Sequence, residues 1–356
     1  MNKRVLIIGP SPLKSKGGMA TVIQEMLESE ILNKDFELGM HESYRDGNIF
    51  YRLIFSIYSF IKFLFIYKKY DIFHLHVASN GSTFRKMLYA KVIKKSAKKI
   101  ILHIHGGQYL EFYRNLSKKN QDRVKKFLIT ADYVIALSEK WKENFEINFN
   151  LKNCAVLENG IDITKYEKAK KYPQKLNKNF LFLGRIVEDK GIFDLIEALL
   201  IAVKKHSDFC VYVGGEGETR KVLDLIKKYK LENNFKLVGW LNEKRKIEIL
   251  SEVDTFILPS HYEALPMSIL EAMACGKAII STKVGAIPEV ILENNGVLIE
   301  VKDIEGIAQA IIKCCEETLW MQKVYNENIK KIFEFYNMRH MHVKLNGYYH
   351  KLVDKI

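Results

Sequence analysis

The chain has 356 residues, of which 48% are hydrophobic and 28% charged, a composition typical of a globular protein and not of a disordered one. This length favours two domains. A formal net charge of +14 predicts anionic partners such as nucleotide phosphates, acidic lipid headgroups or nucleic acid. The five cysteines form no C-x2-C pair, which favours reduced thiols in the cytosol over a disulfide framework or a zinc site.

The N-terminal segment predicts a strand, a glycine-containing loop and a helix that begins near Met19 or Thr21. Gly17 and Gly18 come just before this helix, where backbone N–H groups can face an anion and no Cβ blocks close approach. An ordinary loop is the alternative interpretation. The pattern is neither G-x-G-x-x-G nor a P-loop, so neither a dinucleotide fold nor an NTPase is indicated. The initial apolar run is too short for a signal peptide.

Residues 45–100 are the most basic part of the chain, with twelve Lys or Arg against two Asp. Residues 50–67 are aromatic and aliphatic, but their uninterrupted apolar runs are too short to predict a transmembrane helix. They fit either an interfacial amphipathic helix or a core helix with a solvated basic face. The segment 84–99 predicts a cationic helix. On the interfacial interpretation the residues that meet an anionic membrane are Tyr51, Phe55, Tyr58, Phe63, Phe65, Arg85, Lys86, Lys91, Lys94, Lys95, Lys98 and Lys99.

The segment IILHIHGG predicts a buried strand that ends in His103, His105 and two glycines. Ligands of open α/β sheets bind at the carboxyl ends of strands, and the glycines would let a ligand come close. This placement favours a functional role over a structural one. The H-x-H pattern also raises the possibility of a metal site, but no third ligand lies near it in the sequence.

The first half alternates strands and helices, as a doubly wound sheet does. The segment NGID, followed by the polar and Lys-rich TKYEKAKKYPQKLNKN, predicts a linker. The expected domains are therefore residues 1–165 and residues 175–336. The segment 337–356 predicts a terminal helix.

The second half opens with the strand FLFLG, which stops at Gly184. Arg185 and Lys190 then lie five residues apart in the loop before a helix. A guanidinium and an ammonium beside a helix N-terminus can clamp a diphosphate, and a pair of solvated loop cations is the alternative. The next strand ends in a glycine-rich loop that contains Gly215.

Two carboxylates stand out in the segment LPSHYEALPMSILEAMACGKAIISTKVGAIPE, which predicts a strand, a loop, a helix and a further strand. Glu263 lies in the loop, and Glu271 follows in the helix after seven residues. The helix is apolar nearly all round, so Glu271 is expected to be buried and to need a partner. A ribose diol would supply hydroxyl donors, whereas a surface glutamate on an ordinary helix is the alternative.

This E-x7-E segment, together with the G-R-x4-K-G loop, resembles the retaining GT-B glycosyltransferases of family 4, and the resemblance covers almost the whole chain. It implies an α/β fold of two Rossmann-like doubly wound domains with a cleft between them. The first domain would bind the acceptor and the second the nucleotide sugar. The terminal helix would pack back on the first domain.

The resemblance implies transfer of a hexose from a UDP- or GDP-linked sugar to a glycan or a polyprenyl-diphosphate-linked acceptor, with retention of anomeric configuration. The implied setting is bacterial capsule, exopolysaccharide or O-antigen synthesis at the inner, cytoplasmic face of the membrane. The implied catalytic residues are His105, Arg185, Lys190 and Glu263. The implied donor-binding residues are Gly17, Gly18, Gly184, Arg185, Lys190, Gly215, Glu263, Ala264, Leu265 and Glu271. The chain contains no D-x-D motif, so no metal ion or other cofactor is expected.

Three other classes compete with this interpretation. A nucleotide-sugar 2-epimerase could share the fold, although the E-x7-E pattern favours transfer. A nucleic-acid-binding protein would fit the net charge, but here the basic residues interleave with long apolar runs, which argues against nucleic acid as a partner. A non-catalytic anion-binding protein would need gaps in the motifs, and all motif positions are filled.

Overall fold

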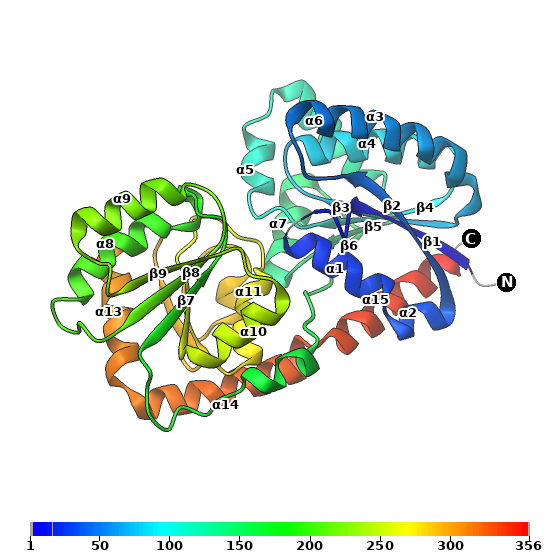
Figure 1. Ribbon diagram of the computed structural model, residues 1–356. Coiled ribbons are helices and arrows are strands. Elements are labelled where there is room, and N and C mark those ends of the chain that lie inside the picture. The colour runs from blue at the N-terminus through cyan, green and yellow to red at the C-terminus, as the bar shows by residue number, and fades with distance from the viewer. Residues whose placement is uncertain (1–2, 16, 355–356) are drawn as a thin grey trace. The chain divides into compact units, whose positions relative to one another are not determined.

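The computed structural model describes residues 3–15 and 17–354. It divides into two compact units, each built on one parallel sheet (Figure 1). Unit 1 comprises residues 1–160 and 338–356, and unit 2 comprises residues 161–337. The expected α/β fold of two doubly wound sheets is thereby confirmed.

The sheet of unit 1 has six parallel strands in the order β2-β1-β3-β4-β5-β6. The strands are β1 (Lys3–Pro10), β2 (Phe36–Tyr44), β3 (Ile72–Val77), β4 (Lys99–Ile104), β5 (Tyr133–Ala136) and β6 (Cys154–Val156). Every residue of β3 is buried, which is typical of a parallel strand covered by helices on both faces.

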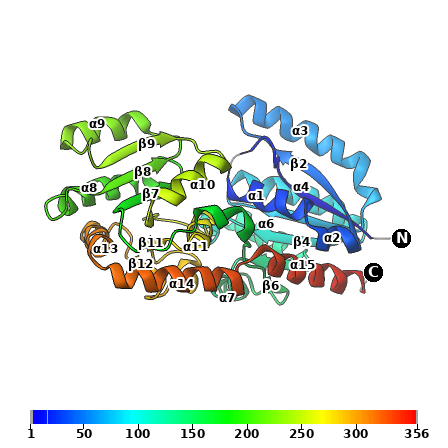
Figure 2. The ribbon, with the colours of Figure 1, turned by 60° about the horizontal axis from the view of Figure 1, so that its bottom comes forward.

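Helices cover both faces of this sheet, with α3 and α4 on one face and α1, α2 and α15 on the other (Figures 1 and 2). The helices of unit 1 are α1 (Gly18–Leu27), α2 (Glu30–Asp35), α3 (Ile49–Ile66), α4 (Gly81–Lys95), α5 (Tyr109–Arg114), α6 (Lys118–Ile129), α7 (Glu139–Phe149) and α15 (Met338–Val353), with a short 3-10 helix at Tyr67–Lys69. The terminal helix α15 belongs to unit 1, where the Asn346 amide donates to Asp35 at 2.7 Å. Residues 355 and 356 of the predicted terminal helix lie outside the described residues.

The sheet of unit 2 also has six parallel strands, in the order β12-β11-β10-β7-β8-β9. The strands are β7 (Asn179–Leu183), β8 (Cys210–Gly214), β9 (Phe235–Gly239), β10 (Thr255–Leu258), β11 (Ala278–Thr282) and β12 (Gly296–Ile299). From β7 the chain adds β8 and β9 on one side, and it adds β10, β11 and β12 on the other side, so the strand order switches direction between β7 and β10. In open α/β sheets a ligand binds outside the carboxyl ends of the strands at such a switch point.

The helices of unit 2 also lie on both faces of their sheet (Figure 1). They are α8 (Ile192–Ala202), α9 (Thr219–Tyr229), α10 (Glu243–Glu252), α11 (Met267–Ala274), α12 (Ile287–Val290), α13 (Ile304–Glu316) and α14 (Thr318–Phe335), with 3-10 helices η2 (Ile163–Ala169) and η3 (Glu188–Lys190). The segment predicted as a linker is partly structured, because η2 packs on α10 and α11 and buries Tyr166 and Ala169. The segment packs on these helices despite its many lysines, because Tyr166 and Ala169 supply the apolar contacts.

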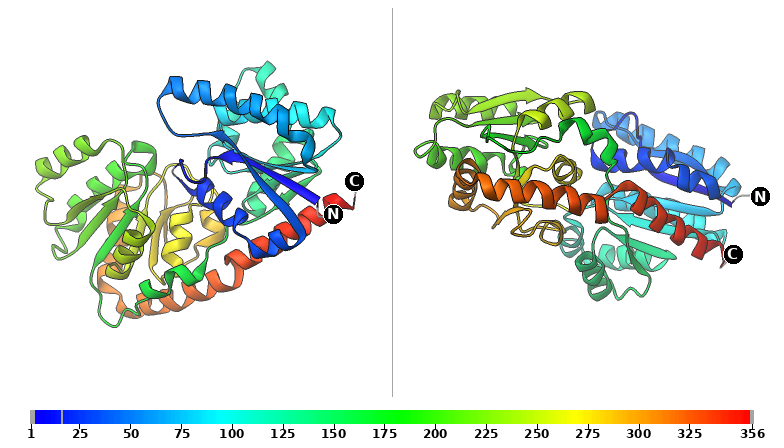
Figure 3. Two further views of the ribbon diagram at one scale, coloured as in Figure 1. Left: turned by 45° about the vertical axis from the view of Figure 1, so that its right-hand side comes forward. Right: turned by 90° about the horizontal axis from the view of Figure 1, so that it is seen from below.

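The aromatic segment 50–67 forms most of helix α3, which lies along one face of the sheet of unit 1 (Figure 3). Its inner side is narrow, because only Phe55, Ser59 and Phe63 are buried. Phe55 and Phe63 are therefore core residues, and the prediction that they face a membrane is wrong. Phe63 packs edge-on against Tyr89 of α4, with ring centroids 4.8 Å apart.

The predicted cationic helix 84–99 is shorter than expected, because α4 ends at Lys95. Lys86 is fully buried in this helix, with its ammonium against the Ser43 hydroxyl. Lys98 and Lys99 pair with Asp71 and Asp132 at 3.4 and 3.6 Å. The exposed cations of this region on α4 are Lys91, Lys94 and Lys95.

A buried histidine is expected to make the stability of unit 1 depend on pH. The Nε2 atom of His41 on β2 lies 2.9 Å from the Ser59 hydroxyl, and burial lowers the pKa of His41 to about 4. An unfolded histidine titrates near pH 6.5. The unfolded chain therefore binds more protons than the folded one between these values, so stability is complete above about pH 6.5 and declines as the pH falls toward 4.

The variant His41→Gln is expected to remove this one contribution to the pH dependence of stability. Below pH 6.5 the free energy of unfolding of the wild type should fall more steeply, by up to about 1.4 kcal/mol per pH unit for one histidine. Urea unfolding of both proteins at pH 7, 6 and 5 measures the difference. Parallel pH curves would show that His41 does not titrate differently on unfolding.

Candidate functional site

The predicted site residues of unit 2 gather at the switch point of its sheet. Gly184, Arg185 and Lys190 follow β7, and Glu263 follows β10, the neighbouring strand. Glu271 lies in α11, which starts directly after the loop of Glu263. The positions that the sequence pattern marked are thus brought to one edge by the parallel pairing of β7 with β10.

Lys190 and Glu263 form an ion pair across this switch point. The Lys190 ammonium contacts Oε1 of Glu263, and the Ser260 hydroxyl donates to the same oxygen at 2.9 Å. The side chains of Lys190 and Glu263 are 20% and 12% exposed, so both are accessible to a small ligand while most of each is shielded from water. Lys190, which is predicted to bind phosphate, and Glu263, which is predicted to bind the sugar, therefore pair with each other in the structure.

A second contact fixes the loop that carries Glu263. The Nε2 atom of His261 lies 2.6 Å from Oδ2 of Asp194 on α8. The backbone N–H of His261 donates to the Asp189 carbonyl at 2.9 Å. Because Asp189 precedes Lys190, these bonds join the two loops that supply the ion pair.

Glu271 is buried, as the sequence predicts, but it has protein partners. The Lys246 ammonium on α10 lies 2.5 Å from Oε1 of Glu271, whose side chain is 8% exposed. Tyr166 of η2 adjoins the same carboxylate, and burial together with the charge of Glu271 raises the pKa of Tyr166 well above its usual range. The Lys246 ammonium also lies 5.8 Å from the centre of the Tyr166 ring. The buried Glu271 carboxylate is thus already paired with Lys246 and does not require a bound ligand to compensate its burial.

Helix α11 begins at the same edge with its N-terminus beside Glu263. Pro266 is its N-cap residue and supplies no side-chain cap. The side chains of Ala264 and Leu265 are buried, so any ligand contact of theirs would come from the backbone. The Ala264 carbonyl already accepts a hydrogen bond from the Ala286 N–H at 2.8 Å.

The remaining positions of unit 2 differ in how closely they are packed. The Arg185 side chain is exposed. The Gly184 N–H donates to the Gly214 carbonyl at 3.1 Å. A Cβ on Gly215 would lie 1.8 Å from the Gly184 carbonyl oxygen, so this glycine is required by the packing of two loops.

The predicted site residues of unit 1 lie at the carboxyl edge of its own sheet. Gly17 has φ +117° as the N-cap residue of α1, and Gly18 is the first residue of that helix. Apart from Gly17 and its two chain neighbours, no atom of the described residues lies within 4 Å of a Cβ built there, so the positive φ and not a lack of space favours glycine. The Nε2 atom of His105 lies 2.8 Å from Nδ1 of His76 on β3. Burial lowers the pKa of His105 below its usual range, so the ring is neutral.

The sequence analysis did not identify the residues that contact Glu271 and His105 in the structure. Lys246 and Tyr166 lie in polar segments without a motif, and nothing in the local sequence marks them. A signal did exist for His74 and His76, because DIFHLHV repeats the H-x-H pattern of the next strand. β3 and β4 pair with His76 opposite His103. The expectation that H-x-H lacks a third neighbouring histidine is therefore wrong.

Family models and relatives match both units. The model "Glycosyltransferase Family 4" matches residues 17–165, and "Glycosyl transferases group 1" matches residues 164–332. An uncharacterized glycosyltransferase of Methanocaldococcus jannaschii is 29% identical over 300 residues, which cover 80% of this chain and 74% of that protein. The capsular polysaccharide biosynthesis glycosyltransferase CapM of Staphylococcus aureus is 30% identical over 220 residues, which cover 58% of each chain.

A solved structure shares the fold over its whole length. HepE of Anabaena, solved in complex with UDP and glucose, has a TM-score of 0.77 and 17% identity, with 100% of both chains covered. At this identity the likeness concerns the fold.

Proposed function

Because the chain belongs to the GT-B glycosyltransferases of family 4, we propose that it moves a sugar from a nucleoside-diphosphate sugar to a glycan or lipid-linked acceptor with retention of anomeric configuration. The observation that carries this proposal is the pair of lysine–glutamate contacts at one edge of unit 2. Each carboxylate of E-x7-E is held by a lysine from another element, Glu263 by Lys190 and Glu271 by Lys246.

These contacts suit a site that waits for a charged ligand. A diphosphate that binds beside α11 would draw the Lys190 ammonium and the Arg185 guanidinium to its oxygens. Glu263 would then be free to accept hydrogen bonds from sugar hydroxyls, and the backbone at Ala264 and Leu265 would complete the sugar contacts. Glu271 would accept hydrogen bonds from the ribose hydroxyls while the contact with Lys246 keeps the carboxylate oriented.

The reaction breaks the bond between the anomeric carbon and a diphosphate oxygen and forms a bond from that carbon to the acceptor oxygen. The proton of the acceptor hydroxyl leaves with the diphosphate. Negative charge grows on the departing diphosphate, and Arg185, Lys190 and the N-terminus of α11 would stabilise it there. The family resemblance further assigns contacts with the donor to Gly17, Gly18, Gly184, Gly215 and His105, and these assignments are part of the proposal.

Two names among the similar proteins support narrower choices. HepE was solved with UDP and glucose, which supports a UDP-linked donor, and a GDP-linked donor is the other choice. CapM is named for capsular polysaccharide biosynthesis, which supports a role in bacterial surface polysaccharide synthesis. The test is incubation with a panel of UDP- and GDP-sugars and a lipid extract, followed by NMR of the anomeric proton of the product. Retention is expected; an inverted product, or a free sugar epimer released without acceptor, would contradict the proposal.

Transfer is expected to need neither Mg²⁺ nor Mn²⁺, because side-chain cations and a helix end supply the positive charge at the diphosphate. The rate should therefore persist in excess EDTA. Rates with EDTA, and after Mg²⁺ or Mn²⁺ is added back, measure this directly. Complete loss in EDTA that either ion restores would overturn the role given to Arg185 and Lys190.

The exposed outer face of α3 supports binding of the protein to a membrane surface. Among the described residues, one helical stretch, Ile49–Lys69, is long and apolar enough to cross a membrane by length and composition. Its Phe55, Ser59 and Phe63 are buried within unit 1, so we propose that it lies in the interface and does not cross the membrane. The exposed large apolar residues of α3 are Ile49, Phe50, Tyr51, Leu53, Ile54, Ile57, Tyr58, Ile61, Leu64 and Phe65.

This face is far more apolar than a helix in contact with water alone would be, since Phe50 and Phe65 are 75% and 79% exposed. Exposed cations of the same unit match an anionic headgroup layer: Lys62 on α3, Lys68 and Lys69 in the 3-10 helix that follows it, and Lys94 and Lys95 on α4. We therefore propose peripheral binding at the inner face of the cell membrane, where a polyprenyl-diphosphate-linked acceptor would be at hand.

The protein is expected to sediment with anionic vesicles and to do so less at high salt. Changing Lys94 and Lys95 to Gln should weaken binding about tenfold, at about 1 kcal/mol or less for each cation. The matched control changes Lys98 and Lys99 to Gln, because these lysines already pair with aspartates. Co-sedimentation that ignores lipid charge and salt, or equal loss in both variants, would contradict docking by this face.

A further inference from the structure

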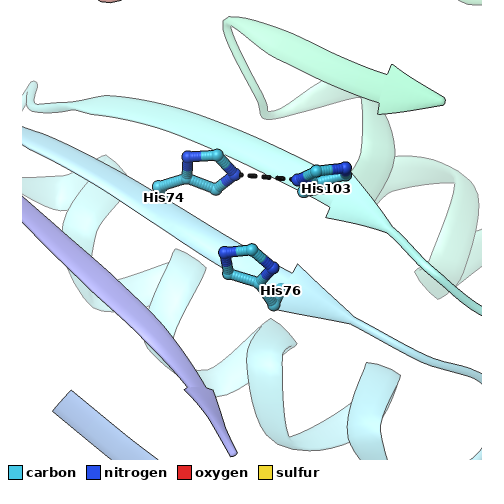
Figure 4. A group of neighbouring side chains, drawn as sticks. All are labelled: His74, His76 and His103. Atoms are coloured by element: carbon cyan, nitrogen blue, oxygen red, sulfur yellow. Dashed lines mark hydrogen bonds between the residues drawn. The ribbon is translucent and has the colours of Figure 1, made fainter. Parts of the chain in front are cut away.

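Histidines from two neighbouring strands gather inside unit 1. His74 and His76 lie on β3, and His103 lies on β4 directly opposite His76 in the sheet register. One ring nitrogen from each lies within 4.8 Å of the other two, and Figure 4 shows the three rings around a common space. The exposed fraction of each side chain is 1% or less.

The polar atoms of this group are incompletely satisfied. Among the described residues, Nε2 of His76 and Nε2 of His103 are buried without a hydrogen-bond partner. A buried polar atom costs free energy unless something binds it, and of these two atoms Nε2 of His76 is the one that an ion between the three rings would bind. A neutral imidazole keeps one ring nitrogen with a lone pair that a metal ion can take.

The rings are held from behind by two further residues. The Tyr349 hydroxyl of α15 lies 2.8 Å from Nδ1 of His74. The Nε2 atom of His105 lies 2.8 Å from Nδ1 of His76. In both histidines the Nδ1 atom has a partner behind the group, so Nε2 is the nitrogen that remains to bind an ion. Metal-binding histidines show this arrangement, in which the second ring nitrogen is hydrogen-bonded and fixes the tautomer.

We propose that Nε2 of His74, Nε2 of His76 and Nδ1 of His103 bind one transition-metal ion of the kind that imidazole prefers, such as Zn²⁺. Nε2 of His74 and Nδ1 of His103 are 3.2 Å apart, close to the separation of two ligands on one tetrahedral ion. The ligand atoms of the three residues lie within 4.8 Å of one another, so an ion that draws Nε2 of His76 closer would also satisfy this buried atom.

The ion would also act on His105. With Nε2 of His76 bound to metal, its Nδ1 carries the proton and donates to Nε2 of His105. His105 would then keep its own proton on Nδ1, so metal binding would select one tautomer of this residue. This site is separate from unit 2 and does not depend on the proposed transfer reaction.

The test is titration of metal-free, tag-free protein with Co²⁺ and with Zn²⁺. One equivalent of Co²⁺ should produce visible absorption bands of a histidine-bound ion, and Zn²⁺ should displace the Co²⁺ and abolish these bands. Affinity-tag histidines must be absent, because they bind the same ions. Elemental analysis of the purified protein gives the metal content independently.

Matched variants separate this site from surface histidines. Tyr349→Phe keeps the buried ring but removes the hydroxyl behind His74, so affinity should fall about 10- to 100-fold. Tyr109→Phe, at another fully buried tyrosine of unit 1, should leave affinity unchanged. His76→Gln and His103→Gln should abolish the Co²⁺ bands, whereas His41→Gln should keep them.

Two outcomes would overturn the proposal. Folded wild-type protein that binds neither ion at one equivalent would mean that the histidines form only a hydrogen-bonded core group. Binding that survives both His76→Gln and His103→Gln would mean that the ion binds elsewhere.

Discussion

Arg185→Ala is expected to lower the rate of sugar transfer about tenfold to a hundredfold while the protein stays folded. A charge-assisted contact to phosphate contributes about 1.5–3 kcal/mol, and its loss raises the barrier by that amount. The side chain is exposed, so its removal should leave the melting temperature nearly unchanged. Steady-state kinetics and a thermal melt of the same preparation measure both effects.

Lys190→Ala should reduce the rate by a similar factor, with one difference. Lys190 pairs with Glu263 in the structure, so the variant also leaves Glu263 with the Ser260 hydroxyl as its remaining described partner. The donor KM should therefore change along with kcat. Lys227→Ala is the matched control, because this exposed lysine lies in the last turn of α9, away from the switch point. Wild-type rates in both Arg185→Ala and Lys190→Ala would remove these residues from the site.

Glu271→Gln is expected to weaken binding of the bare nucleoside diphosphate about tenfold to a hundredfold, because a carboxylate is lost from the ribose hydroxyls. Glu263→Gln should leave that binding nearly intact and lower turnover, because Glu263 is assigned to the sugar, which the nucleoside diphosphate lacks. Calorimetry with the nucleoside diphosphate separates the two roles. Equal losses in both variants would show that the roles are not divided in this way.

Glu271 is buried against Lys246, so its variant needs a stability control. Removing one partner of a shielded ion pair can destabilise the fold without any ligand. Lys246→Met removes the other partner and keeps the carboxylate. If Glu271 acts on the ribose, Lys246→Met should weaken nucleotide binding less than Glu271→Gln at equal melting temperature. A larger loss in Lys246→Met would assign the nucleotide contact to the lysine instead.

The switch-point site could be predicted because its residues follow local patterns. Strands β7 and β10 are apolar runs that end in loops before helices, and parallel pairing brings such ends together. The spacing of Glu263 and Glu271 places one residue in the loop and one in the helix. The partners could not be predicted, because Lys246 and Tyr166 reach the site only through the packing of α10 and η2 on α11.

The errors in unit 1 arise where an element is apolar or basic on several sides. Helix α3 has apolar residues all round, so its sequence could not show that the stripe of Phe55, Ser59 and Phe63 faces inward. For α4 a signal was present: Lys86 lies three and seven residues before Tyr89 and Ile93, on the same helical face. That spacing indicates that Lys86 faces inward, but the sequence analysis counted it among the basic residues of a cationic helix and did not use the spacing.

The central claim is that unit 2 binds a nucleoside-diphosphate sugar at its switch point, and a thermal-shift screen of nucleotide sugars tests it most directly. A ligand at a hundredfold excess over its dissociation constant stabilises the folded protein by about 2.7 kcal/mol. At least one UDP- or GDP-sugar is expected to raise the melting temperature of the wild type, and the shift should shrink in Arg185→Ala and Glu271→Gln but not in Lys227→Ala. A folded wild type whose melting temperature no nucleotide sugar raises, or a shift that is equal in all four proteins, would contradict the claim.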